Sequence, residues 1–288
     1  MLSTLFVLSL SLVSSIQDPV APAAPVAKAE PEAIDAVYER LLAAKGDAEI
    51  ERLMRGRPYE VIGLVDGYLE GWLASQENPG APAEPGAKAP ARLLELAQDA
   101  AKRADATFKT DAYSRYANAW KGWSTEQRLQ FREGQKQYGL GREAMRAKKL
   151  DEAKTAFAAS LKLADPLGDL WGIAQAEQSL GDVAAGAAAG AADAGAKKAL
   201  LDEAIAHHKR GAHVFGELRH PGVLRSLRAL GNLHEQAGDL KAARFALERM
   251  MDVATEAQRL DNTGPVKKDL ARLCRALGDE DAAKKWDS

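Results

Sequence analysis

The chain has 288 residues, of which 46% are hydrophobic and 28% charged, and its formal net charge is −2. This is the composition of an ordinary soluble protein, and without a basic excess we expect no nucleic-acid binding. The lone cysteine, Cys274, excludes an internal disulfide and a cysteine-based zinc site, and the aromatic content of only 6% suits close-packed helices better than a β-sandwich.

A short apolar run with interspersed serines begins the chain. It is shorter than the roughly 20 residues that a membrane helix needs. Because Val13 and Ser15 suit a small-residue cleavage site, residues 1–15 are predicted to be a secretory signal peptide. No Lys or Arg precedes the run, so an uncleaved anchor or a mis-assigned start codon is the alternative. Cleavage would leave a secreted or periplasmic protein with no stable membrane span. Residues 16–33, which are rich in Pro and Ala, are typical of an extended linker.

Two stripes of apolar residues with helical spacing follow the linker. The first lies at 34–42 and the second at 61–73, and a Gly-Arg-Pro break separates them. This arrangement predicts an antiparallel helical hairpin over residues 34–77. Residues 78–91 are again rich in Pro, Gly and Ala, so we expect a second linker there.

Helical periodicity resumes over residues 92–123 and ends in an aromatic stripe. Its four aromatic residues are spaced so that they share one helical face, which allows two interpretations. The favoured one is a seam that packs the N-terminal helices onto the following segment. The alternative is an exposed platform for a peptide or a sugar. The four residues are Tyr113, Tyr116, Trp120 and Trp123.

Residues 124–288 contain a Leu-Gly or Leu-Ala pair that recurs in register with an alanine twelve residues after its second member. In the second of four copies this interval is 23 residues, because an Ala/Gly-rich insertion falls at 184–196. A constant interval indicates one helix pair stacked on copies of itself. We expect the array to begin with a helix start at Ser124 and to end in a short polar capping helix at 279–286. The pairs end at Gly141, Gly181, Gly231 and Ala271, and the matching alanines are Ala153, Ala204, Ala243 and Ala283.

Within each copy the same local chemistry is expected. Gly238 and Gly278 should end their helices, since glycine adopts the left-handed conformation that closes a helix. A large apolar residue, Phe157 or Leu247, lies four positions after the repeat alanine and therefore on the same helical face. The second copy departs from this pattern, with His208 at that position.

With these residues in view, the stretch from about 126 to 288 resembles a tetratricopeptide-repeat array. Successive copies are 40 residues apart, measured from Gly231 to Ala271, which is similar to the longer repeats of kinesin light chains. The resemblance implies an all-α fold in which helix pairs form a right-handed superhelix beside an N-terminal helical region. The residues that match the family pattern in order are Leu140, Gly141, Ala144, Ala153 and Phe157.

The resemblance also implies a concave groove, lined by the first helix of each pair, that holds a partner peptide. The groove positions can be counted from the small residue of each Leu-Gly or Leu-Ala pair. They are Gln135, Tyr138, Arg142, Gln175, Gln178, Asp182, Arg225, Arg228, Asn232, Lys268, Arg272 and Arg275.

The last two repeats place a cluster of cations at these positions. One hypothesis is that this basic patch captures an acidic or C-terminal segment of a protein partner through charge-assisted hydrogen bonds. The alternative, equally open, is that the arginines are solvated or paired with neighbours such as Glu235 and Asp269.

No motif in the chain predicts catalysis, a metal or a cofactor. All five histidines lie between His207 and His234, but none is three or four residues from another, so they are interpreted as surface and turn residues. The glycines at 190–196 have the spacing of a phosphate loop but lack its lysine. Cys274 lies on an inward position and is expected to be a buried structural thiol.

The sequence therefore favours an exported, non-enzymatic scaffold that binds a protein or peptide in its repeat groove. Two alternatives come from other classes of function. The chain could be a regulatory or sensor subunit for a protease or a kinase, since similar arrays are often fused to such enzymes. It could also be a cell-envelope protein that binds glycans on the aromatic face around Trp120.

Overall fold

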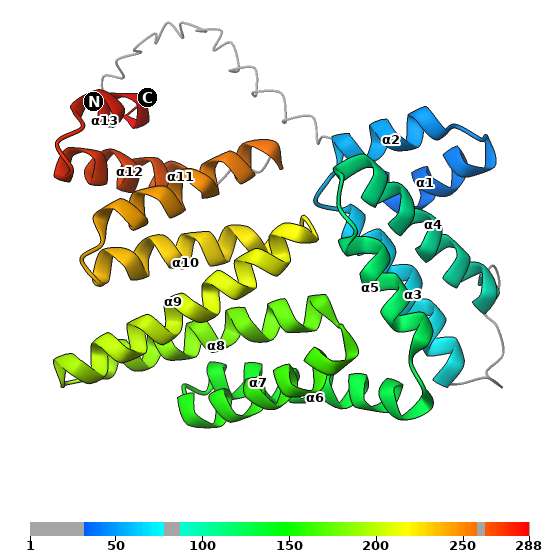
Figure 1. The fold of residues 1–288 in the computed structure, drawn as a ribbon, viewed down its shortest axis with the longest axis horizontal. Helices are drawn as coiled ribbons and strands as arrows, with labels where there is room; N and C mark the ends of the chain where they lie inside the picture. The colour runs from blue at the N-terminus through cyan, green and yellow to red at the C-terminus, as the bar shows by residue number, and fades with distance from the viewer. Residues whose placement is uncertain (1–31, 78–86, 258–262, 288) are drawn as a thin grey trace, which may run out of the picture. The chain divides into compact units, whose positions relative to one another are not determined.

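The computed structural model describes residues 32–77, 87–257 and 263–287. In these residues the chain forms thirteen α-helices and one 3-10 turn, with no strand, which confirms the all-α prediction for the described part (Figure 1). From Ile34 onward the chain is one compact unit. The predicted signal peptide at 1–15 lies outside the described residues, as do most of the two predicted linkers.

The N-terminal region contains more helices than its periodicity predicted. Where a hairpin was expected over 34–77 the chain forms three helices, because Lys45 adopts a left-handed conformation with φ of 55° and splits the first of them. Lys109, with φ of 56°, divides the region 92–123 in the same way. The five helices are α1 (Ile34–Ala43), α2 (Asp47–Gly56), α3 (Val61–Glu77), α4 (Pro90–Phe108) and α5 (Ala112–Gly122).

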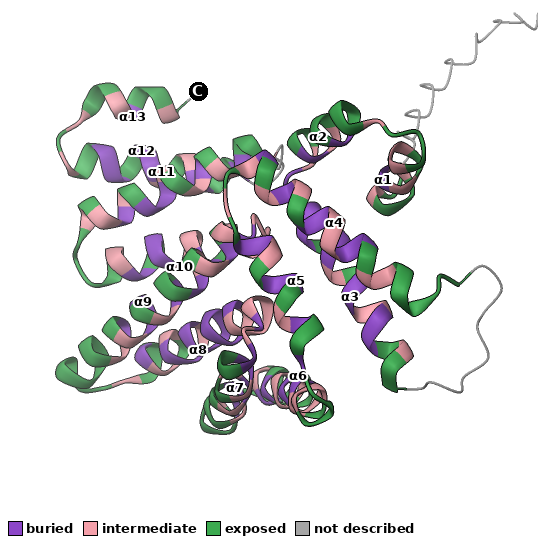
Figure 2. Ribbon diagram, turned by 45° about the vertical axis from the view of Figure 1, so that its right-hand side comes forward, coloured by how far each residue is buried: buried purple, intermediate pink, exposed green. Residues whose placement is uncertain are grey.

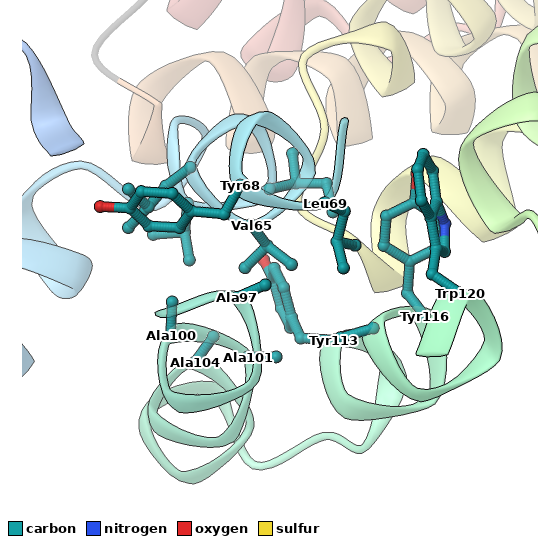
Figure 3. Packing of buried hydrophobic residues seen from close by; sticks show 14 of the residues in the cluster. Val65, Tyr68, Leu69, Ala97, Ala100, Ala101, Ala104, Tyr113, Tyr116 and Trp120 are labelled. Atoms are coloured by element: carbon teal, nitrogen blue, oxygen red, sulfur yellow. The ribbon is translucent and has the colours of Figure 1, made fainter. Parts of the chain in front are cut away.

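Helix α3 is the centre of the N-terminal core. Its Val65 and Leu69 lie opposite a row of alanines on α4 that includes Ala97 and Ala101, and all four are buried (Figure 3). The small alanine side chains let two helices approach closely, while the larger side chains of α3 fill the space between them. The buried residues of α3 extend from Val61 to Leu73, and Figure 2 colours the helices by burial.

The four aromatic residues at the end of this region form a seam, as the favoured interpretation predicted. All four are buried, with exposed fractions of at most 4%. The rings of Trp120 and Trp123 lie 4.6 and 5.0 Å from that of Phe131 in the next helix, and the indole N–H of Trp123 donates to the carbonyl of Leu167 at 3.0 Å. Burial leaves no ring face for a sugar, so the alternative of an exposed platform is wrong.

From Ser124 onward the helices follow one another as packed neighbours (Figure 1). The predicted start is confirmed, because Ser124 and Gln127 form a reciprocal capping box at the first of these helices. The elements are α6 (Thr125–Arg146), α7 (Leu150–Ala164), η1 (Asp165–Leu167), α8 (Leu170–Gly190), α9 (Ala194–Glu217), α10 (Gly222–Gln236), α11 (Leu240–Glu256), α12 (Gly264–Ala276) and α13 (Glu280–Trp286).

The three glycines of the Leu-Gly pairs occupy equivalent places in these helices. Each lies against the side chain four positions after the repeat alanine, so close that an added Cβ would clash with it. Helix–helix contact at these points therefore requires glycine. The partners are Phe157 for Gly141, at 2.5 Å from such a Cβ, His208 for Gly181, at 2.7 Å, and Leu247 for Gly231.

The turns between paired helices are equivalent as well. Gly238 and Gly278 adopt φ of 82° and 78° seven residues after the small residue, which confirms them as helix ends. In the first copy the same position is Lys148, with φ of 59°. The insertion at 184–196 extends both helices of the second copy, since only residues 191–193 separate α8 from α9.

Candidate functional site

Two neighbouring hollows lie along α6 and α8. The larger, which we call the acidic cavity, has a volume of about 330 Å³, and the predicted groove residues Gln135 and Gln175 line it. The smaller, with a volume of about 160 Å³, is lined by Asp182 and Arg225 among others. Tyr138 and Arg142 line both. The structure thus brings together groove positions of the first three repeats.

The acidic cavity is completed by residues outside the predicted groove positions. Asp66 and Glu70 come from α3 and Tyr116 from α5, so the N-terminal helices close one side of it. Asp169, at the start of α8, contributes a third carboxyl group. The sequence contains one signal for two of these acids: Asp66 and Glu70, one helical turn apart, interrupt an otherwise apolar stripe.

Burial perturbs two of these carboxyl groups. It raises the pKa of Asp66 to about 6 and that of Asp169 to about 7, and in each case the charge of Glu70 adds to the effect. Each also accepts a hydrogen bond from a neutral donor, Asp66 from the Tyr116 hydroxyl at 2.6 Å and Asp169 from the Gly172 amide at 2.9 Å. These bonds favour the ionised form but do not offset the desolvation.

Glu70 has a different environment, because it is paired. Arg132 donates to it at 2.9 Å and the side chain of Gln135 at 2.8 Å. The same guanidinium also bonds to Glu77 at 2.6 Å, so α6 is tied to α3 along the edge of the cavity.

The arginines of the predicted basic patch are paired with carboxylates. Most of these pairs join the first helix of one repeat to the first helix of the next, and together they form an ion-pair ladder along α8, α10 and α12. These contacts agree with the interpretation that the arginines of the patch are paired with neighbouring carboxylates. The pairs are Arg225 with Asp182, Arg228 with Asp269 at 2.7 Å, Arg272 with Glu235 at 2.9 Å, and, at the C-terminal end, Arg275 with Asp287.

The remaining groove positions divide between packing and exposure. Gln178 is buried, and its amide donates to the carbonyl of Gly222 at 2.9 Å and to the hydroxyl of Ser226 at 2.8 Å, so it joins α8 to α10. Asn232 and Lys268 are exposed. Gln178 therefore stabilises the contact between α8 and α10.

His208 corrects the interpretation of the histidines as surface and turn residues. Its side chain is fully buried, and within the described structure neither ring nitrogen has a hydrogen-bond partner. Burial lowers its pKa to about 4, with help from the charge of Arg225, so the ring packs as a neutral group. Cys274 is buried as expected, and burial raises the pKa of its thiol.

Comparisons with known proteins give no family for this chain: no protein-family model matches it, and no curated protein matches its sequence. No helix in the described ranges has the length and apolar character to cross a membrane. In the same ranges, no three His, Cys, Asp or Glu side chains are grouped so that they could hold a metal ion.

Proposed function

We propose that residues 124–288 are a right-handed array of tetratricopeptide-type helix pairs, and that the protein is an exported, non-enzymatic scaffold that binds an extended peptide along the first helices of its repeats. The observation that carries the proposal is the equivalence of Gly141, Gly181 and Gly231, each of which contacts the same position of its partner helix. Equivalent contacts in successive pairs are expected of a stacked repeat, and such stacks offer extended surfaces for binding.

The location of the hollows supports the same proposal. Both are lined by α6 and α8, the first helices of the first two pairs, and Tyr138 and Arg142 are common to them. An extended peptide that followed this face would pass from one hollow to the other. The ion-pair ladder continues the same face along α10 and α12.

Photo-crosslinking tests the proposed binding face. The photoreactive residue p-benzoylphenylalanine replaces Tyr138 in one variant and, as a matched control, Phe245 in another, since Phe245 is a 64% exposed aromatic residue on the second helix α11. Each purified variant is irradiated in an extract of its cells of origin. We expect a discrete crosslinked protein at position 138 and none at position 245. Crosslinking at position 245 alone, or at neither position, would reject the groove.

A further inference from the structure

We propose that the acidic cavity binds the ammonium group of a lysine side chain, which belongs to the peptide held in the groove. The peptide as its source rests on the proposed function, whereas the recognition of an ammonium ion rests on the cavity alone. Three features of the cavity support it: the uncompensated carboxyl groups, the aromatic walls, and the poor fit of a metal ion.

The charge in the cavity is not compensated by the protein itself. Glu70 is paired with Arg132, but Asp66 and Asp169 accept hydrogen bonds only from neutral groups among the described residues. Arg142 also lines the cavity, yet its side chain is exposed and makes no bond to either carboxyl group in the described structure. A cation that entered would remove the unfavourable interaction between these two buried acids.

Aromatic rings complete the walls of the cavity. Tyr138 and Trp171, which are only partly buried, line it together with the carboxyl groups. Aromatic faces attract cations through their quadrupole, and this attraction grows where water is excluded. A volume of about 330 Å³ lies at the small end of ligand pockets, which suits a single alkylammonium chain.

A metal ion fits this arrangement less well than an ammonium group. The carboxyl groups of Asp66, Glu70 and Asp169 do not converge closely enough to form a metal site. An ammonium group has three N–H donors on a flexible stem. It therefore needs only one or two of these carboxylates as partners, while its four methylene groups contact the rings.

Proton release should accompany binding. Asp66 and Asp169 carry raised pKa values of about 6 and about 7, so part of the population is protonated near neutral pH. The other charged or titratable groups around them are Glu70 on the same helix as Asp66, Tyr116 on α5, and Arg132, Tyr138 and Arg142 on α6. Because an ammonium ion requires the ionised carboxylates, its affinity should increase with pH.

The experiment uses the whole protein and two small probes. N-acetyl-lysine methylamide and its uncharged analogue N-acetyl-norleucine methylamide are titrated by calorimetry at pH 8. We expect millimolar binding of the lysine probe and at least about tenfold weaker binding of the norleucine probe. At pH 5.5 the affinity for the lysine probe should fall by about tenfold or more, because both carboxyl groups are then mostly protonated.

Variants identify the residues, and the pH titration of the unmodified protein tests the inference even if a variant does not fold. The double variant Asp66→Asn/Asp169→Asn should bind the lysine probe at least about tenfold more weakly than the unmodified protein. The control Asp281→Asn, at a 98% exposed carboxylate on α13, should leave the affinity for the lysine probe unchanged. Equal affinity for the two probes, or affinity independent of pH, would overturn the inference. If position 138 crosslinks while the lysine probe fails, the lysine assignment alone is wrong; if the probe binds without a crosslink, the peptide source is wrong.

Discussion

Two glycines of helix α6 give a matched test of helix contact in the first repeat. Gly141 lies against Phe157, and a Cβ added to it would lie 2.5 Å from the ring, whereas a Cβ added to Gly139 would meet nothing within 4 Å. Both Gly→Ala changes gain about 1 kcal/mol of helix propensity. Only Gly141→Ala adds an atom to a filled contact, which costs about 1–3 kcal/mol. The two variants should therefore differ by about 1–3 kcal/mol, with Gly139→Ala more stable than the unmodified protein.

Urea unfolding followed by circular dichroism at 222 nm measures this difference directly. A second change, Phe157→Leu, removes part of the ring and should restore part of the stability lost in Gly141→Ala. Equal unfolding midpoints for the two alanine variants would show that α6 and α7 are not in the contact described. Gly141 would then no longer be equivalent to Gly181 and Gly231.

Three further variants test burial and protonation. Trp120→Ala should destabilise the protein by about 3–5 kcal/mol, measured by urea unfolding, since its ring is fully buried; a loss below about 1 kcal/mol would contradict the seam. His208 has a pKa of about 4, below its ordinary 6.5, so it makes the protein lose stability as pH falls through this range; His208→Leu should flatten that loss in urea midpoints measured from pH 7 to 4. Asp169 has a pKa of about 7, above its ordinary 3.8, so it adds stability as pH falls from 7 to 4. Asp169→Asn, which keeps a helix cap, should remove this dependence and stabilise the protein at pH 8 by on the order of 2 kcal/mol; an unchanged pH profile would contradict the burial of this carboxyl group.

The repeats could be predicted because their signals are local. The interval from small residue to alanine places Gly141 and Gly231 against their partners, and glycine at 238 and 278 marks helix ends by its residue type. The extra helix breaks at Lys45 and Lys109 could not be predicted, since lysine in a left-handed conformation reflects tertiary packing and not residue preference.

The acidic cavity could not be predicted for a different reason. Asp66 and Asp169 are about a hundred residues apart in the sequence, and they meet only because the aromatic seam packs α5 against α6. No periodicity within either segment specifies that contact. The predicted groove positions Gln135 and Tyr138 follow from the repeat register, but Asp66 and Glu70, which line the same cavity, belong to a region outside the repeats.

The distribution of charge also decides which kind of partner would suit the proposed groove. An acidic segment that bound Arg228 or Arg272 would compete with Asp269 and Glu235, which already pair with those arginines, so it would exchange one ion pair for another with little net gain. A cation that entered the acidic cavity would displace no partner of Asp66 or Asp169 except a proton. The free-energy gain should therefore be larger for a basic side chain, because the arginines of the basic patch are already paired within the protein.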